Sequence, residues 1–279
     1  MIVISLFDGI SCGLEALKRA KIKVTEYHAF EIDKNAIKIS NKNHPEIIRH
    51  GNVELFDFKK FYGADLLIGG SPCQGFSIPG KLLNFDDPRS MLYFEYERAK
   101  NEIKPFYFML ENVPMKEEWL GVISNRLNTN PHALNSELVS AQRRWRYYWY
   151  NWTIPEPYDF KITLKDVLIT DYEYIKNYKV NNTPSRDIMW YGKKCKDITY
   201  SNKSNCLTTK QDRWGNAGLI KFEDYCRYLT PIECERLQTL PDNYTEGINR
   251  NERYKVLGNC WTVNMISWLF WYSPFGNAR

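Results

Sequence analysis

The first 111 residues alternate short apolar runs with amphipathic segments. Four runs rich in β-branched and aromatic residues are typical of buried strands, at residues 2–7, 26–31, 65–69 and 106–111. The segments between them have apolar residues three or four positions apart, as in helices, at residues 14–20, 35–42 and 92–103. This alternation predicts an α/β fold, with a parallel sheet covered by helices on both faces.

The most distinctive residues come directly after the expected strands. They are Phe7 to Gly9, Glu31, Asn52 and Val53, Pro72 and Cys73, and Glu111 and Asn112. In open α/β sheets, ligands bind outside the carboxyl ends of the strands. The pattern therefore predicts a ligand site at this edge of the sheet.

The first two of these clusters are typical of a nucleoside site. The segment FDGISCG places Gly9 and Gly13 between strand and helix, which leaves room for a ligand close to the backbone. Glu31 ends the next strand, where a carboxylate can accept hydrogen bonds from both hydroxyls of a ribose. The loop lacks the G-x-G-x-x-G pattern that suits a diphosphate, so we expect S-adenosylmethionine. An ordinary turn with two glycines and an acid is the alternative.

The segment DLLIGGSPCQGFS presents Cys73 on a tight loop after a strand, outside any apolar face, which makes it a candidate nucleophile. Arg144 and Arg146, two apart on an expected strand, can point the same way and lower the pKa of the thiol. Glu111, at the end of the neighbouring strand, can transfer a proton at the molecule that is attacked. Each residue alone fits an ordinary structural role, but together at one sheet edge they favour catalysis.

The composition is that of a globular protein. The 279 residues are 43% hydrophobic, enough for one large core or for a core and a small second domain. No apolar run approaches the roughly 20 residues that span a bilayer, and the N-terminus lacks a basic leader, so we expect a cytoplasmic protein with no membrane partner. The seven cysteines form no C-x-x-C pair, which favours reduced thiols and no metal site.

The positive charge is concentrated in one part of the chain. Residues 175–215 contain nine Lys or Arg and three Asp, a net charge of +6, whereas the whole chain carries +5. Aromatic side chains are interleaved with these cations, at Tyr178, Trp190, Tyr191, Tyr200 and Trp214. This mixture suits phosphate contacts and stacking with nucleic acid. A solvated basic face without a partner is the alternative.

Seven motifs together resemble one enzyme family. FDGISCG, EID, GGSPCQGFS, DPRSMLYFE, ENV, QRRWR and GNCWTV occur in the order found in the cytosine-C5 DNA methyltransferases, and the resemblance covers nearly the whole chain. The segments SLFDGI and VSAQRRWRYYW, and Trp261 after GNC, look most like the catalytic domain of the animal de novo enzymes. The compactness of the chain suggests a bacterial or phage enzyme.

The resemblance implies a Rossmann-like, S-adenosylmethionine-dependent methyltransferase fold with a small target recognition region. The implied parts are a catalytic and cofactor-binding domain at residues 1–154, a target recognition region at 155–226, and a segment at 227–279 that returns to the catalytic domain. In the last part, Thr230, Pro231 and Glu233 predict a helix start with a capping box. CWTVNMISWLFWY, at residues 260–272, predicts a buried helix.

The resemblance also implies the reaction, in which a cytosine is rotated out of a DNA duplex and methylated at C5. Cys73 would attack C6, while Glu111 would hold N3 and the exocyclic amine and supply a proton. Arg144 and Arg146 match the motif that supports the base and the attacked loop. Residues 74–90 would close over the base as a lid, with an ordinary surface loop as the alternative.

Two larger sets of residues follow from the resemblance. The positions expected to contact the cofactor are Phe7, Asp8, Gly9, Ile10, Glu31, Ile32, Asn52, Val53, Pro72, Leu92, Asn259, Cys260 and Trp261. Those expected to contact DNA are Gln74, Ser77, Arg186, Lys193, Lys194, Lys196, Lys210, Gln211 and Arg213. The chain departs from the common pattern at Ser11 and Cys12, where many bacterial members have glycine, at Asn52, which is often Asp, and at Cys260, which is usually Ser.

Two rival functions stay open beside a monomeric enzyme acting on double-stranded DNA. One is a tRNA cytosine methyltransferase on the same scaffold, although the loop PCQGFS lacks the C-F-T element associated with those relatives. The other is a catalytically inactive DNA-binding relative. Such a protein would not need to retain Cys73, Glu111, Arg144 and Arg146 together.

Overall fold

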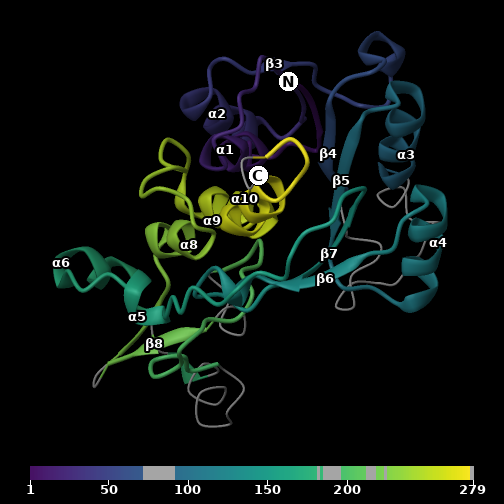
Figure 1. The fold of residues 1–279 in the computed structure, drawn as a ribbon. Coiled ribbons are helices and arrows are strands. Elements are labelled where there is room, and N and C mark those ends of the chain that lie inside the picture. The colour runs from purple at the N-terminus through teal and green to yellow at the C-terminus, as the bar shows by residue number, and fades with distance from the viewer. Residues whose placement is uncertain (72–91, 181–182, 185–195, 212–217, 223–224, 277–279) are drawn as a thin grey trace. The chain divides into compact units, whose positions relative to one another are not determined.

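The computed structural model describes residues 1–71, 92–180, 183–184, 196–211, 218–222 and 225–276 (Figure 1). The chain divides into two compact units, of which the first comprises residues 1–135, 145–155 and 267–279 and the second comprises residues 136–144 and 156–266. The expected lid at 74–90 lies outside the described residues. So do eight predicted site residues: Pro72, Cys73, Gln74, Ser77, Arg186, Lys193, Lys194 and Arg213.

The first unit is built on a seven-stranded sheet with the order β3-β2-β1-β4-β5-β7-β6. Its strands are β1 (Ile2–Leu6), β2 (Glu26–Phe30), β3 (Ile48–Arg49), β4 (Leu66–Gly70), β5 (Tyr107–Asn112), β6 (His132–Asn135) and β7 (Trp145–Tyr150). The strands β1 to β5 are parallel in the Rossmann-like order 3-2-1-4-5, which confirms the predicted parallel sheet. β7 runs antiparallel to both β5 and β6, which the apolar pattern did not indicate.

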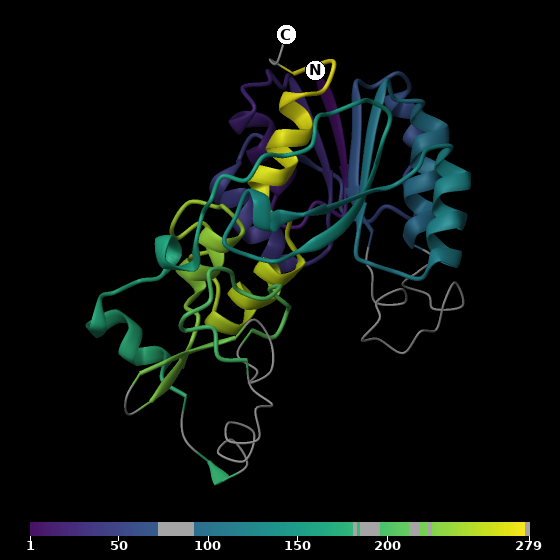
Figure 2. The same ribbon diagram turned by 60° about the horizontal axis from the view of Figure 1, so that its bottom comes forward.

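Helices cover both faces of this sheet, as predicted (Figures 1 and 2). One face carries α1 (Cys12–Arg19) and α2 (Lys34–Asn43), and the other carries α3 (Leu92–Ile103) and α4 (Glu117–Leu127). α2 begins where the Asp33 carboxylate accepts hydrogen bonds from two free backbone N–H groups, those of Asn35 at 2.9 Å and Ala36 at 3.3 Å. A short 3₁₀ helix, η1 (Phe58–Phe61), follows β3 in the chain.

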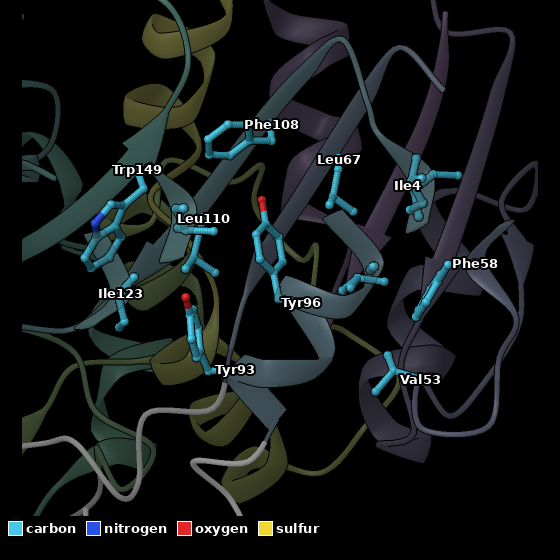
Figure 3. Close-up of a cluster of buried hydrophobic side chains, with 14 of the residues drawn as sticks. Ile4, Val53, Phe58, Leu67, Tyr93, Tyr96, Phe108, Leu110, Ile123 and Trp149 are labelled. Carbon is cyan, nitrogen blue, oxygen red and sulfur yellow. The ribbon is translucent and has the colours of Figure 1, made fainter. Parts of the chain in front are cut away.

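A hydrophobic core fills the space between the sheet and the helices α3 and α4 (Figure 3). Tyr93 and Tyr96 of α3 are fully buried in it. A Cβ atom at Gly69 of β4 would lie 2.8 Å from the ring of Tyr96, so a larger residue there would push the ring away. The glycine therefore lets α3 pack closely on the strand that leads toward Cys73.

The second unit contains mostly short elements. They are η3 (Ser136–Leu138), α5 (Leu164–Val167), α6 (Tyr172–Ile175), η4 (Lys176–Tyr178), the hairpin of β8 (Leu219–Lys221) and β9 (Cys226–Tyr228), α8 (Pro231–Leu237) and α9 (Arg250–Asn259). Lys203 ties distant segments together, because its ammonium donates hydrogen bonds to the backbone carbonyls of Glu137, Ser140 and Ile162.

The predicted start of α8 is confirmed. The Thr230 hydroxyl accepts a hydrogen bond from the Glu233 N–H at 3.2 Å, and the Glu233 carboxylate accepts one from the Thr230 N–H at 2.7 Å. The same carboxylate binds both terminal nitrogens of the buried Arg227 at 2.8 Å. This pair joins β9 to α8.

α10 (Val263–Trp271) is the buried helix predicted near the C-terminus, and its residues belong partly to each unit. Five of its side chains have no exposed surface: Val263, Met265, Ile266, Leu269 and Phe270. None of the helices in the described part of the chain has the length and apolar character needed to cross a membrane. Within the same residues, the five cysteines are free thiols and no cluster of three His, Cys, Asp or Glu could hold a metal ion.

We expect the first unit to lose stability in mild acid because of His44, the buried C-cap of α2. Burial, together with the Lys18 ammonium 2.9 Å from Nδ1, lowers the pKa of His44 from 6.5 to about 4. The unfolded chain then binds a proton that the folded chain excludes, so this stability contribution is complete above pH 6.5 and is lost as the pH falls toward about 4.

The melting temperature should therefore fall between pH 6.5 and pH 4, and His44→Asn should flatten that fall. An asparagine oxygen can still accept from Lys18, but it does not titrate. His132→Asn, at an exposed histidine of β6, serves as the control and should keep the slope of the unmodified protein. An unchanged slope in His44→Asn would show that other groups cause the acid sensitivity.

Candidate active site

The loop between β1 and α1 has an unusual backbone. Phe7, Gly9 and Ser11 all have positive φ angles, of 57°, 58° and 63°. A Cβ atom at Gly9 would meet no atom within 4 Å, so open space lies beside the backbone there. This agrees with the room for a ligand predicted at Gly9, whereas Gly13, predicted in the same turn, is a buried residue of α1.

Glu31, directly after β2, joins this loop to the neighbouring strand end. Its carboxylate accepts hydrogen bonds from the backbone N–H groups of Gly9 at 2.8 Å, Ile32 at 2.7 Å and Asp33 at 2.8 Å. It also lines a pocket of about 180 Å³ in the first unit. The other lining residues are Asp8, Gly9, Ala29, Ile37, Ser40, Arg49 and Gly51.

Two predicted cofactor residues near Glu31 are exposed. The side chain of Ile32 is 69% exposed, which is unusual for an isoleucine in a well-packed unit. Asn52 is also exposed, and its amide group exchanges hydrogen bonds with the backbone N–H and the carboxylate of Glu54. The side chain of Val53, by contrast, is 4% exposed and belongs to the core, and its backbone carbonyl accepts a hydrogen bond from Arg98 Nη2 at 2.9 Å.

Asp8 turns its carboxyl group inward. The carboxylate accepts hydrogen bonds from the hydroxyls of Ser5 at 2.6 Å, Tyr27 at 2.7 Å and Ser11. Burial raises the pKa of Asp8, and the three hydroxyl donors oppose that effect. The backbone N–H of Asp8 donates to the Phe30 carbonyl at 3.0 Å, and its carbonyl accepts from the Ser11 N–H at 3.0 Å. The contact expected of Asp8 with a cofactor therefore stays a prediction.

The end of β5 carries Glu111, which is 8% exposed. Its carboxylate forms an ion pair with Arg146 of β7, with 2.9 Å between Oε1 and Nε. Gly70, at the end of β4, is the register partner of Glu111. Because Cys73 follows Gly70 by only three residues in the sequence, the predicted acid lies beside the strand end that leads to the predicted nucleophile.

Arg144 and Arg146 have different partners. β7 begins at Trp145, so the prediction that both arginines lie on one strand is wrong. Arg144, in the second unit, is 3% exposed and donates hydrogen bonds to the carbonyls of Leu207 at 3.1 Å, Gly258 at 3.0 Å and Cys260 at 2.9 Å. The expected effect of Arg144 on the pKa of the Cys73 thiol stays a prediction, because Cys73 lies outside the described residues.

The remaining predicted cofactor residues are in three places. Ile10 is buried in the loop before α1, and Leu92 is the partly buried first residue of α3. Asn259, exposed, and Cys260, buried, end α9 in the second unit, and the partly buried Trp261 follows them. The contacts expected of these residues with a cofactor stay predictions.

Three predicted DNA contacts lie within the described residues. Lys196 and Lys210 are exposed in the second unit, as phosphate contacts would require. Gln211 is 2% exposed, and its side-chain oxygen accepts a hydrogen bond from the Thr208 N–H at 3.4 Å. Gln211 is therefore inside the unit in this structure, where it cannot reach a base edge without a rearrangement.

Sequence reasoning missed Tyr27, Ser40 and Arg49, which connect to Asp8 behind the loop. Arg49 ends β3 and donates to Ser40 of α2 at 2.8 Å. Only Arg49 could have been found from the sequence, because it lies two residues before Gly51 and Asn52, at an expected strand end where ligands bind. Hydroxyl groups in apolar strands and helices carry no comparable signal.

Comparisons with known proteins agree with this geometry. The family described as C-5 cytosine-specific DNA methylase matches residues 1–148 and 124–270. The Type II methyltransferase M1.ScrFI of Lactococcus lactis subsp. cremoris is 30% identical over 95% of this chain and 75% of its own length. The Type II methyltransferase M.HhaI of Haemophilus parahaemolyticus is 26% identical over 95% of this chain and 92% of its own.

The solved structure of the Entamoeba histolytica methyltransferase EhMeth has the same fold, with a TM-score of 0.79 and 20% identity over 98% of this chain and 97% of its own. The family match extends over most of the described elements, including β1, the strand end at Glu111 and α9. The chain therefore belongs to the C-5 cytosine-specific DNA methylase family, whose members methylate carbon 5 of cytosine in DNA.

Proposed function

We propose that Cys73 is the nucleophile and Glu111 the general acid of this methyl transfer to DNA. The observation that carries the proposal is the buried ion pair of Glu111 with Arg146, next to the end of β4. An arginine at this distance fixes one carboxylate oxygen and therefore the orientation of the whole group. Glu111 is thus held ready to face a base delivered near the loop that follows β4.

The proposed reaction uses a covalent detour. The Cys73 thiolate adds to C6 of the cytosine, Glu111 provides a proton at N3, and C5 becomes an enamine-like carbon that can accept a methyl group. Loss of the C5 proton to a base and departure of the Cys73 thiolate then restore the C5–C6 double bond, and the N3 proton returns to Glu111, which leaves a neutral 5-methylcytosine. S-adenosylmethionine supplies the methyl group when it is bound.

The first unit contains residues that fit this cofactor. The Glu31 carboxylate, already fixed by three backbone N–H groups, would accept the ribose hydroxyls. The exposed Ile32 offers an apolar face for the adenine ring, and Asn52 offers an amide for its edge. The open space at Gly9 leaves room beside the loop backbone.

We further propose that residues 155–226 recognise the DNA target. Support comes from the charge of +6 between residues 175 and 215 and from exposed lysines such as Lys196 and Lys210. The reactive carbon of a stacked cytosine is inaccessible, so the base would be rotated out of the duplex. The two bacterial relatives favour action in the cytoplasm, and we propose a monomer.

Labelled methyl transfer tests this function directly. Purified protein is incubated with S-adenosylmethionine labelled in the methyl group and either duplex DNA or bulk tRNA, and the products are digested and analysed for 5-methylcytosine. We expect label in DNA alone. Label in tRNA alone would replace the proposed substrate with the rival one, and label in neither, with DNA binding retained, would support an inactive relative.

A second test concerns the basic stretch. Replacing Lys193, Lys194 and Lys196 together by Ala should weaken DNA binding at every sequence, because phosphate contacts carry no sequence information. The slope of log K against log salt should become shallower by up to about 0.9 per lost contact, while turnover at saturating DNA is kept. Fluorescence anisotropy with duplex DNA at several salt concentrations gives the slope.

The control replaces three exposed lysines of the first unit, Lys23, Lys38 and Lys59, which removes the same total charge. This variant should keep most of the salt dependence. Equal slopes for the two variants would show that the lysines near residue 195 form a solvated face and do not bind DNA.

A further inference from the structure

A continuous chain of hydrogen bonds runs behind the loop between β1 and α1. Arg49 Nη2 donates to Ser40 Oγ at 2.8 Å, Ser40 Oγ lies 2.6 Å from Ser11 Oγ, and Ser11 Oγ donates to the Asp8 carboxylate. The two serines are buried, with exposed fractions of 0% for Ser11 and 2% for Ser40. The chain therefore connects a cation to an anion through two hydroxyls that water does not reach.

The chemistry of its ends fixes the direction of this chain. A guanidinium only donates hydrogen bonds and a carboxylate only accepts them. Ser40 must therefore donate to Ser11, and Ser11 must donate to Asp8. Hydrogen bonds aligned in this way polarise one another in a low-dielectric interior, so the chain is stronger as a unit than its separate bonds.

The chain of hydrogen bonds also accounts for an unfavourable backbone conformation at Ser11. Ser11 precedes α1 with a φ of 63°, in the left-handed region that favours glycine, and its side chain does not cap the helix. The hydroxyl is directed to Asp8 instead. Tyr27, a buried residue of β2, donates to the other oxygen of the same carboxylate at 2.7 Å, so the loop is held from two sides.

This chain of hydrogen bonds borders the candidate cofactor site. Asp8, Ser40 and Arg49 line the same 180 Å³ pocket as Gly9 and Glu31. Asp8 directly precedes Gly9, whose N–H donates to Glu31 at 2.8 Å. If breaking this chain of hydrogen bonds lets the loop shift, Gly9 will therefore move away from the Glu31 carboxylate.

We infer that Tyr27, Ser40 and Arg49 are positioning residues, which act through Asp8 and Ser11 to hold the loop in the shape that binds the nucleoside part of the cofactor. The inference rests on the proposed function, in which the loop and Glu31 bind S-adenosylmethionine. Ser40 and Arg49 border the pocket itself, whereas Tyr27 acts only through the Asp8 carboxylate. Their effect is on the affinity for the cofactor and not on the chemical step.

Ser40→Ala is the first test. It removes the central hydroxyl, and with it the link between Arg49 and Ser11. The dissociation constant for S-adenosylhomocysteine, the unreactive product, should rise about 10-fold. Loss of a hydrogen bond to a charged group costs a free energy that corresponds to about this change in a binding constant. Titration calorimetry measures it. The kcat at saturating cofactor and DNA should stay within about twofold of the unmodified value, since the reacting groups are unchanged.

A double-mutant cycle tests whether the hydroxyls act as one chain. Ser11→Ala and Ser40→Ala should each weaken binding, and the double variant should be scarcely weaker than either. Ser11→Gly removes the same hydroxyl but tolerates the positive φ, so equal losses in Ser11→Gly and Ser11→Ala would assign the effect to the hydrogen bond. Tyr27→Phe, which keeps the ring, probes the other carboxylate oxygen and should also weaken binding.

Ser124→Ala provides the matched control. The Ser124 hydroxyl joins Leu120 of α4 to the buried Trp149 in the same unit, so its loss should lower the melting temperature without changing cofactor affinity. If Ser40→Ala and Tyr27→Phe also keep the unmodified affinity, the network only stabilises the fold and the inference is wrong. If the unmodified protein itself fails to bind S-adenosylhomocysteine, the proposed cofactor is wrong and the inference falls with it.

Discussion

Cys73→Ala is expected to abolish methyl transfer to DNA while leaving DNA affinity within a few fold. The thiol would form a covalent bond in the reaction but makes few contacts with the bound base, so its loss acts on the transition state. Without addition at C6, C5 of cytosine has no nucleophilic character. Labelled methyl transfer and fluorescence anisotropy on the same preparation separate the two effects.

A trapping experiment makes the prediction specific to covalent chemistry. Duplex DNA with 5-fluorocytosine at the target position should become attached to the unmodified protein, because fluorine cannot leave C5 as a proton does. Cys73→Ala should form no such complex. Cys226→Ala, at a partly buried cysteine of the second unit, should be trapped normally. Methyl transfer that survives in Cys73→Ala would refute the mechanism.

Glu111→Gln is expected to lower kcat by about 100-fold or more, since a glutamine cannot give a proton to N3. The amide keeps the size of the side chain and one acceptor oxygen, so Arg146 Nε can still donate to it. Binding of S-adenosylhomocysteine should be nearly unchanged. Single-turnover kinetics at saturating cofactor and DNA isolate the affected step.

Glu97→Gln is the control for loss of a carboxylate. Glu97 of α3 forms an ion pair with Arg126, also at 2.9 Å, in the same unit and away from the sheet edge that carries Glu111. It should turn over at the unmodified rate. Near-normal turnover in Glu111→Gln would move the acid role to another group.

The parallel half of the sheet was predictable because its strands are buried on both faces. β1, β2, β4 and β5 are short, mostly buried strands rich in apolar residues, separated by helices, and few other folds produce this pattern. The sheet edge carrying Glu31 and Glu111 followed from the same pattern. Thr230 and Glu233 marked the start of α8 because a capping box is local in sequence.

The antiparallel β7 was not predictable in the same way. Its burial and pairing depend on β5 and β6. The residues of a strand do not by themselves indicate whether it pairs in parallel or antiparallel. The carbonyl partners of Arg144 lie from 63 to 116 residues away in the sequence. A long-range hydrogen bond to a backbone carbonyl does not depend on the partner's side chain, so no sequence motif indicates it.

The same is true of the network around Asp8. Ser11 and Ser40 are 29 residues apart, and neither residue type indicates that its hydroxyl is buried and aimed at the other. The resemblance drew attention to Asp8 as a cofactor contact, and the structure shows where its carboxylate is directed. Cys73 and most of the expected DNA contacts lie outside the described residues, so their roles stay predictions.

The bonds of Arg144 and Lys203 also bear on how the protein can evolve. Both side chains end on main-chain carbonyls, at Leu207, Gly258 and Cys260 for Arg144 and at Glu137, Ser140 and Ile162 for Lys203. Every amino acid supplies such a carbonyl. Side chains can therefore change at most of the accepting positions while these hydrogen bonds are kept, with the exception of Gly258, where a Cβ atom would lie 2.3 Å from the backbone of Thr208.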